Sequence, residues 1–226
     1  MIAQGTRAIR LIALVGLLWP CLSLPAAAAQ AARAFTDLVY ATPEGSDPLA
    51  LDLYMPLNAR RPPLVVYVHG GGWSAGDKSQ YPAFLVERGF ALASVEFRST
   101  NIAPFPANIH DIKAAIRFLR AKASEYGYRA ERVALVGSSS GGHLAALAGV
   151  TNGNEQLEGT GGEYSSESSD VQAIVSYFGA SNLTTILAQS TPFGLNVRVP
   201  ALQRLLCASP DDAAELARLA SPVFHV

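Results

Sequence analysis

A cluster of three serines between glycines is the first place in this sequence where residue types and spacing indicate chemistry. In the segment 137–141, which reads GSSSG, only Ser139 has a glycine two residues away on both sides. A predicted strand over 132–136 and a predicted helix over 141–149 flank it, which is the setting of a G-x-S-x-G nucleophile elbow. A sharp, strained turn there lifts the central hydroxyl above the sheet, near the positive end of the helix. The pattern predicts Ser139 as a nucleophile; a serine- and glycine-rich loop without catalytic function is the alternative.

A second glycine turn, which reads HGGGW over 69–73, directly follows a predicted buried strand over 64–68. Three successive glycines expose backbone N–H groups and let a ligand approach them closely. Acyl transfer needs such donors for the oxygen of its tetrahedral intermediate, and the loss of one donor costs about 3–4 kcal/mol in a protease. This turn is therefore a candidate oxyanion hole.

Binding of a phosphate group is the alternative for this turn. From Gly71 the chain reads GGWSAGDKS, which departs from a phosphate loop because Asp77 separates the last glycine from Lys78. An acidic side chain at this place would face the phosphates. The sequence therefore favours acyl transfer over nucleotide binding.

Strands and helices alternate through the middle of the chain, and both turns follow strands. The runs typical of strands are 51–55, 64–68, 91–97, 132–136 and 171–178. The first of them alternates in polarity, as an edge strand does, and helical spacing predicts a helix that starts after Pro106 and ends near Gly127. Such a rhythm builds a mostly parallel sheet with helices on both faces. The sequence thus predicts an α/β fold in one domain, residues 30–226.

Two surface features are expected from polarity. On the helix after Pro106, the side chains of Lys113, Arg117 and Arg120 are predicted to face water. The segment 151–170 is rich in glycine, serine and glutamate without periodicity, which predicts a mobile surface loop.

The two glycine turns, in this order and each after a strand, resemble the esterase/lipase branch of the α/β-hydrolase family. The segments that carry the resemblance are HGGGW, GSSSGGHLA, LDLYMP, GFALASVEFRS, FPANIHDIKAAIRFLR and ASPVFHV. The sequence is most similar to the feruloyl-esterase-like (BD-FAE) and hormone-sensitive-lipase-like groups, with kynurenine formamidase a near relative. The resemblance runs from about Leu51 to Val226. It implies an α/β-hydrolase fold and hydrolysis of small-molecule carboxylic esters.

The resemblance also implies roles for single residues. Ser139 matches the nucleophile that forms the acyl-enzyme, and Gly71 and Gly72 match the oxyanion-hole donors. The N–H of Ser140 matches the donor that follows the nucleophile; the family usually has alanine there, and serine should be tolerated because the backbone donates. His69 matches a structural residue of the turn.

Trp73 allows two interpretations. It either walls the acyl pocket or is a plain core aromatic residue.

The base and acid of a triad are not apparent after Ser139. In this fold a serine is followed by Asp or Glu and then by His. His143 lies in the same predicted helix as the serine and more naturally packs or caps there. His225 falls where a linker is expected, so its pairing with Asp211 or Asp212 is the less favoured alternative.

In the family, the acid and base follow two further strands that would come after ASPVFHV. We therefore expect a C-terminally incomplete hydrolase domain with its last strands missing. Such a domain would have an exposed sheet edge, uncovered apolar surface and almost no activity.

Composition excludes several other classes of protein. The chain has 226 residues, half of them hydrophobic, and its formal net charge is −1, so neither a disordered chain nor a nucleic-acid or membrane-surface binder is expected. Two cysteines cannot build a disulfide scaffold, and four scattered histidines leave little material for a metal site. We expect no metal and no cofactor.

The N-terminus has the features of a secretory signal peptide over residues 1–29. Arg7 and Arg10 precede a short apolar run, and small residues follow Pro25. Pro20 and Pro25 interrupt a run that would need ~20 apolar residues to cross a membrane. We expect an exported protein, secreted or periplasmic, without a membrane span in its mature chain.

The sequence therefore predicts a serine hydrolase of carboxylic esters. The alternatives are a non-catalytic protein of the same fold, either vestigial or binding, and an amidase or formamidase. The substrate and the oligomeric state are not readable from the sequence.

Overall fold

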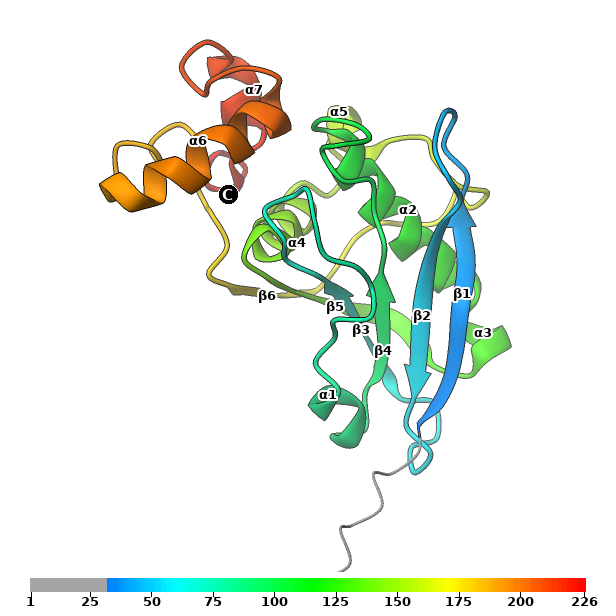
Figure 1. Cartoon of the computed structure of the whole chain (residues 1–226). Helices are drawn as coiled ribbons and strands as arrows, with labels where there is room; N and C mark the ends of the chain where they lie inside the picture. The colour runs from blue at the N-terminus through cyan, green and yellow to red at the C-terminus, as the bar shows by residue number, and fades with distance from the viewer. Residues whose placement is uncertain (1–31) are drawn as a thin grey trace, which may run out of the picture. The chain divides into compact units, whose positions relative to one another are not determined.

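Six strands form one sheet in the order β1-β2-β4-β3-β5-β6 (Figure 1). The computed structural model describes residues 32–226, so the predicted signal peptide over 1–29 lies outside the described residues. The strands are β1 (Arg33–Ala41), β2 (Leu49–Met55), β3 (Pro63–Val68), β4 (Ala91–Val95), β5 (Arg129–Ser138) and β6 (Ala173–Tyr177).

Four of the six strands run parallel. β3 pairs with β4 and with β5, and β5 pairs with β6, each in parallel, whereas β1 and β2 join the sheet antiparallel. The prediction of an α/β fold with a mostly parallel sheet is confirmed.

The prediction that the segment 51–55 forms an edge strand is wrong. It lies in β2, which pairs with β1 on one side and β4 on the other. Leu51 and Leu53 are fully buried, and Asp52, which looks outward-facing in the sequence, is also buried and accepts hydrogen bonds from the Asp37 N–H and the Lys78 ammonium. Because this carboxylate has partners inside the protein, its polarity did not mark a solvent face.

The helices are α1 (Phe84–Glu87), α2 (Ala107–Ala121), α3 (Ala123–Tyr126), α4 (Ser140–Val150), α5 (Glu155–Glu158), α6 (Pro192–Leu206), α7 (Ala214–Leu219) and the 3-10 helix η1 (Pro222–Phe224). Those on the two faces of the sheet differ in size. The main core includes buried residues of α2 and α4, such as Ile112 and Leu144. On the opposite face, Val86 of α1 packs on Val65 and Val136. Helices cover both faces of the sheet, as predicted, but the helix α1 on the second face is only a single turn long.

The basic side chains of α2 do not all face water. Lys113 is fully buried and Arg117 nearly so, which contradicts the prediction for both residues. Both pair with Glu158 of α5, at 2.5 and 3.2 Å, and the Lys113 ammonium also donates to the Thr151 carbonyl. A charged side chain can be buried when it is paired in this way.

The Arg120 guanidinium is partly buried and donates to the carbonyls of Ala130 and Asp170.

The segment 151–170, predicted as a mobile loop, is held on α2 by these contacts. It contains α5, and Ser169 donates to the same Glu158 carboxylate at 2.7 Å. The sequence pattern missed this because long-range ion pairs leave no period in the sequence, and the one buried residue of α5, Leu157, does not make a period by itself.

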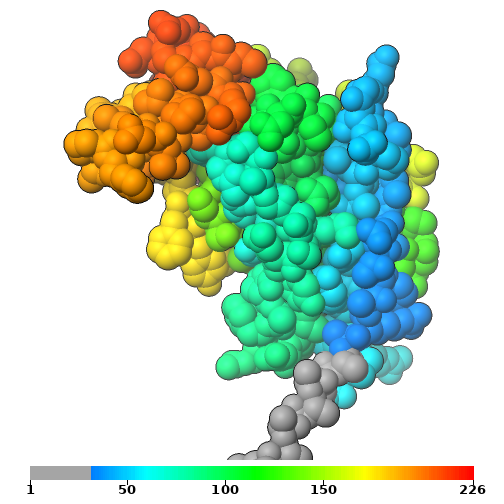
Figure 2. Space-filling model, in the orientation of Figure 1, coloured from blue at the N-terminus to red at the C-terminus, as the bar shows by residue number. Residues whose placement is uncertain are grey.

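β6 is one of the two outer strands of the sheet, and all five of its residues are exposed. Val175, Tyr177 and the following Phe178 leave apolar surface in contact with solvent. The yellow atoms of this part of the chain are uncovered in Figure 2, below the orange and red lobe of the C-terminal helices. The expected exposed edge with apolar surface is found at this strand.

The C-terminal helices α6 and α7 lie beyond one end of the strands (Figure 1). They are attached through Leu205, whose carbonyl accepts from the Phe105 N–H at 2.9 Å, and through Ser221, whose hydroxyl accepts from the Leu183 N–H at 2.8 Å. Over residues 32–226, no helix has both the length and the apolar character that a membrane crossing needs.

Candidate active site

The two predicted turns meet at one edge of the sheet. β3 and β5 are parallel neighbours, with Val68 opposite Gly137, so the chain leaves both strands at the same end. β6 ends there too, with Tyr177 opposite Ser138. Parallel strands bring their carboxyl ends to one edge, which is where ligands of open α/β sheets bind.

Ser139 occupies the tip of the turn between β5 and α4. Its backbone has φ 53° and ψ −121°, a conformation that costs a residue other than glycine about 1–3 kcal/mol. The turn is held because the Ser139 N–H donates to the Tyr177 carbonyl at 2.7 Å, and the Ser139 carbonyl accepts from the His143 N–H at 3.0 Å. The side chain is exposed. The sharp, strained bend that the sequence predicts is therefore present.

The flanking glycines are required by close backbone contacts. A methyl group at Gly137 would lie 2.2 Å from the Gly141 carbonyl oxygen, and one at Gly141 would lie 2.2 Å from the Val68 carbonyl oxygen. Any side chain at either position would therefore push α4 away from β3 and β5. This is the physical reason for glycine two residues before and after Ser139.

Of the three neighbouring serines, Ser139 alone is exposed. The Ser138 hydroxyl lies 3.2 Å from the Tyr67 hydroxyl, within hydrogen-bond distance. The Ser140 side chain is buried, and its hydroxyl has no hydrogen-bond partner among the described residues. An incoming carbonyl carbon would therefore meet the hydroxyl of Ser139.

The glycine turn lies against Ser139. A methyl group at Gly70 would be 3.4 Å from the Ser139 Cβ. Gly71 and Gly72 follow with φ values of 126° and 61°, and a methyl group at Gly71 would lie only 1.9 Å from the Ala75 carbonyl oxygen. Within residues 32–226, the N–H groups of Gly71, Gly72 and Ser140 donate to no protein acceptor. Backbone N–H groups without a protein acceptor are thus found in the glycine turn that contacts Ser139 and at the residue that follows Ser139.

His69 and Trp73, at the two ends of the glycine turn, are both buried. The His69 ring stacks on Phe97 at 4.5 Å and lies 3.6 Å from the Glu96 carboxylate. Trp73 belongs to the main core, and its indole N–H donates to His143 at 3.0 Å. These contacts favour the core interpretation of Trp73 over a wall of an acyl pocket.

The phosphate-binding alternative finds no support in the contacts of Lys78. Its ammonium group lies 2.7 Å from Asp52 and 2.9 Å from Asp37. Two carboxylates therefore already neutralise the cation that a phosphate loop would need.

None of the four histidine rings hydrogen-bonds to Ser139. Their partners are Gly70 for His69, Gln156 for His110, Trp73 and Ala220 for His143, and Leu219 for His225. Asp212 accepts from Ser209, so it and His225 make separate contacts. In the described part of the chain, no histidine is therefore placed to act as a base for the Ser139 hydroxyl.

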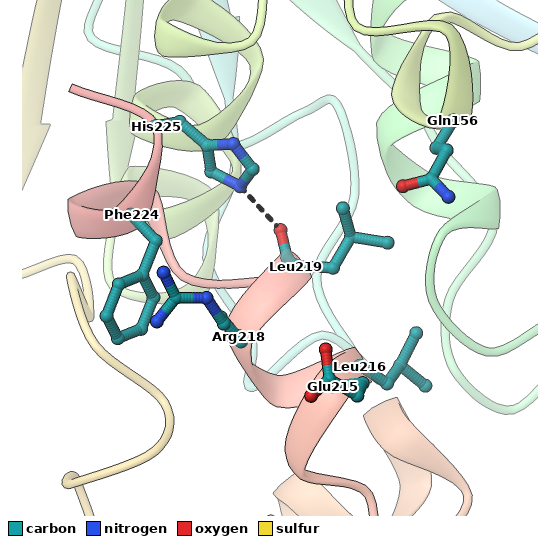
Figure 3. Close-up of a pocket in the computed structure, with 7 residues that line it drawn as sticks. All are labelled: Gln156, Glu215, Leu216, Arg218, Leu219, Phe224 and His225. Atoms are coloured by element: carbon teal, nitrogen blue, oxygen red, sulfur yellow. Dashed lines mark hydrogen bonds between the residues drawn. The ribbon is translucent and has the colours of Figure 1, made fainter.

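His225 instead lines a pocket of about 450 Å³ with Leu216, Arg218 and Phe224 (Figure 3). The Arg218 guanidinium lies 4.1 Å from the centre of the Phe224 ring, and the His225 Nε2–H donates to the Leu219 carbonyl. None of the residues assigned to the candidate site lines this pocket.

The described residues contain no group of three or more His, Cys, Asp or Glu side chains close enough together to hold a metal ion.

Sequence reasoning missed two residues that adjoin the nucleophile turn. Tyr177 anchors the turn through its carbonyl, and Phe178 has φ 57° with its side chain 94% exposed. Gly179 then passes so close to α4 that a methyl group on it would lie 2.5 Å from the backbone nitrogen of His143. In the sequence, the pair Phe178-Gly179 at the end of an apolar run was the feature that could have indicated a close contact of this segment with the turn at Ser139.

A model of the BD-FAE family matches residues 51–226 of this chain. Among curated proteins, the chain is 30% identical over 169 residues to "Probable carboxylic ester hydrolase LipM" of Mycobacterium tuberculosis. That match covers 73% of this chain and 38% of LipM.

Two solved structures are similar in both fold and sequence. A bifunctional GH43-CE protein of Bacteroides eggerthii has a TM-score of 0.75 and 35% identity, covering 85% of this chain and 26% of that one. A truncated form of a carbohydrate esterase from gut microbiota has a TM-score of 0.75 and 30% identity, covering 88% of this chain and 74% of that one. The chain thus spans less than two fifths of LipM but about three quarters of the truncated esterase.

Proposed function

Because this chain belongs to the BD-FAE family of α/β-hydrolase esterases, we propose that it carries the nucleophile and oxyanion donors of a carboxylic-ester hydrolase. The observation that carries the proposal is the exposed Ser139 on a strained turn, beside the unpaired N–H groups of Gly71, Gly72 and Ser140.

In the proposed reaction, the Ser139 hydroxyl oxygen attacks the ester carbonyl carbon. The carbonyl oxygen becomes negatively charged and accepts hydrogen bonds from the three N–H groups. The alcohol leaves with a proton, an acyl-enzyme remains on Ser139, and water then releases the acid and restores the hydroxyl. The turn keeps the hydroxyl and the donors in place before the substrate arrives, so little reorganisation is needed.

The proton of Ser139 must pass to a base for rapid turnover. Each histidine of the chain is bonded to another group in this structure. We therefore propose that this polypeptide by itself hydrolyses esters slowly.

Labelling with a fluorophosphonate probe tests the nucleophile. We expect covalent labelling of the chain and of Ser138→Ala, and no labelling of Ser139→Ala, with the modified peptide located by mass spectrometry. Ser138→Ala is the matched control because it removes the neighbouring hydroxyl of the same turn. Labelling that survives Ser139→Ala would contradict the assignment, and an unlabelled but folded chain would favour the non-catalytic alternative.

Added imidazole tests the lack of a base. We expect millimolar imidazole to accelerate release of nitrophenol from 4-nitrophenyl acetate in the chain more than in Ser139→Ala, which corrects for direct hydrolysis by imidazole. Equal acceleration in both proteins would contradict the proposal that the lack of a base limits the acylation of Ser139.

The substrate class can be narrowed by comparison. One structural relative is named a carbohydrate esterase, so we propose acylated carbohydrates as the first natural esters to test, with the matching amides and N-formylkynurenine beside them. Faster cleavage of the amides or of N-formylkynurenine than of the esters would favour the amidase or formamidase alternative.

We further propose that the protein is exported after removal of residues 1–29. The basic and apolar pattern of these residues supports this. Mass spectrometry of the protein from a secreting host should show an N-terminus at residue 30, and an intact N-terminus would contradict the proposal.

A further inference from the structure

His143 joins three segments of the fold inside the main core. It lies in the first turn of α4 and is completely buried. The Trp73 Nε1–H donates to its Nδ1 at 3.0 Å, and its Nε2–H donates to the Ala220 carbonyl at 2.7 Å. A carbonyl can only accept and an indole N–H can only donate. The ring is therefore neutral, with its one proton on Nε2.

The bond to Trp73 connects the two halves of the candidate oxyanion hole. Trp73 directly follows Gly71 and Gly72, whereas His143 shares the first turn of α4 with Ser140. The Trp73 backbone has φ 60°, and its carbonyl accepts from the Thr100 N–H at 2.8 Å. The indole is thus the side-chain link that holds the end of the glycine turn against the helix that bears the third donor.

The bond to Ala220 connects the same ring to the C-terminal segment. Ala220 directly follows α7, and the next residue, Ser221, donates its hydroxyl proton to the Ala217 carbonyl and accepts from the Leu183 N–H. One imidazole ring therefore fixes the glycine turn on one side and the end of α7 on the other.

We propose that His143 is a positioning residue of the ester-hydrolysing site, which sets the Gly71 and Gly72 donors relative to Ser139 through Trp73. The inference rests on the proposed function and adds a residue that touches neither the substrate nor the reacting atoms. Oxyanion donors act only within about 2.7–3.1 Å of the developing charge. A small shift of the turn therefore lowers reactivity without removing any donor.

The arrangement requires an unprotonated Nδ1. A second proton would place an Nδ1–H against the Trp73 N–H, so that two donors would face each other. Burial lowers the pKa of His143 to about 4, although the hydrogen bond to Ala220 acts in the opposite direction. The titratable groups on the neighbouring segments have other partners: His69 contacts Gly70 and Glu96, Arg218 contacts Phe224, and His225 contacts Leu219.

Three substitutions separate the two bonds. His143→Asn keeps an acceptor near the position of Nδ1, His143→Gln keeps a donor near the position of Nε2, and Trp73→Phe removes the indole donor. In the folded full chain, we expect His143→Gln and Trp73→Phe to shift the backbone amide NMR signals of Gly71 and Gly72. We expect His143→Asn to leave these signals closer to those of the wild type.

The labelling rate of Ser139 by the fluorophosphonate probe supplies the second readout. We expect at least a tenfold decrease in His143→Gln and in Trp73→Phe, no further decrease when both are combined, and recovery of most of the rate in His143→Asn. Effects that fail to add are expected when two residues act through one contact.

The fluorescence of Trp73 supplies a third readout that needs no hydrolysis. Trp19 is the other tryptophan of the chain, so Trp19→Phe leaves Trp73 as the only indole. We expect a reversible change in emission with a midpoint near pH 4 at constant far-UV circular dichroism, which His143→Gln abolishes. The same titration in His143→Gln would overturn the proposed contact.

The outcomes distinguish this inference from the proposed function. Unchanged Gly71 and Gly72 signals in folded His143→Gln and Trp73→Phe would overturn the positioning role, even if Ser139 is labelled. Shifted signals in a chain whose Ser139 is not labelled would support the positioning of the turn, while the proposed function would fail.

Discussion

Gly71 and Gly72 are adjacent residues with positive φ, yet they differ in how much space surrounds them. A methyl group at Gly71 would overlap the Ala75 carbonyl oxygen, whereas a methyl group at Gly72 would meet no atom within 4 Å. At Gly72 the cost of a side chain is therefore mainly conformational. At Gly71 a steric cost adds to it.

This difference predicts unequal effects of two matched substitutions. We expect Gly72→Ala to lower the free energy of unfolding by about 1 kcal/mol and Gly71→Ala by about 3 kcal/mol or more. Urea unfolding measures both values. An equal, small loss in both variants would contradict the described turn.

Ser140 presents a different case at the same scale, because its backbone is assigned a role and its hydroxyl is not. The hydroxyl is buried without a partner in the described residues, and an unsatisfied buried polar group costs about 1–3 kcal/mol. We expect Ser140→Ala to raise the free energy of unfolding by about 1 kcal/mol and to leave the labelling rate of Ser139 nearly unchanged. Loss of labelling in a folded Ser140→Ala protein would show that the side chain takes part.

At the scale of elements, a charged cluster helps to attach α5 to α2, beside the fully buried Leu157 of α5. Glu158 of α5 accepts from Lys113, Arg117, Ser169 and the Gly153 N–H. Burial by itself raises the pKa of Glu158, but the hydrogen bonds from Lys113 and Ser169 outweigh it and hold the pKa below its usual value.

The attachment of α5 to α2 is expected to weaken more when the charge of Glu158 is removed than when the charge of Lys113 is removed. Glu158→Gln leaves two buried cations without a counter-ion, and we expect a loss of about 3 kcal/mol in the free energy of unfolding. Lys113→Met leaves Glu158 with Arg117 and Ser169 as partners, so we expect a loss of only about 1 kcal/mol in the free energy of unfolding. Urea unfolding compares the two, and a larger loss in Lys113→Met would contradict this account.

The same cluster gives a direction for the effect of pH. A carboxylate whose pKa is lowered by folding stabilises the protein above its unfolded pKa, and this stabilisation is lost as the pH falls through the folded pKa. We expect the stability difference between wild type and Glu158→Gln to shrink below about pH 4. Unfolding curves at pH 7 and pH 3.5 measure it, and a constant difference would contradict the assignment.

At the scale of the whole molecule, the outer strand β6 leaves apolar side chains exposed to solvent. An edge strand with exposed apolar side chains is a site for pairing with another chain. We expect self-association that increases with concentration in sedimentation velocity, and we expect Val175→Lys to reduce it.

Leu57→Lys is the control for this test. It exchanges an exposed apolar residue for lysine in the turn after β2, away from the open edge. A wild-type protein that stays monomeric at all concentrations, or an equal effect of both lysines, would argue against association through β6.

The local sequence determined the parts of this protein that depend on neighbours along the chain. Continuous apolar runs fixed β3 and β5 because parallel strands are buried on both faces. The glycine spacing fixed the bend at Ser139 because no other residue fits so close to the backbone of β3 and α4. Both turns, and the esterase family to which they point, followed from these short segments.

Tertiary structure decided what depends on partners distant in sequence. Only the fold shows that β1 covers the edge of β2, that Glu158 neutralises Lys113 and Arg117 inside the protein, and that α6 and α7 close onto Phe105 and Leu183. Only the fold shows that His143 is bonded on both sides and therefore unable to serve Ser139 as a base. The chemical type of a side chain determines which hydrogen bonds and ion pairs it can form, but its surroundings in the fold decide which of them it makes.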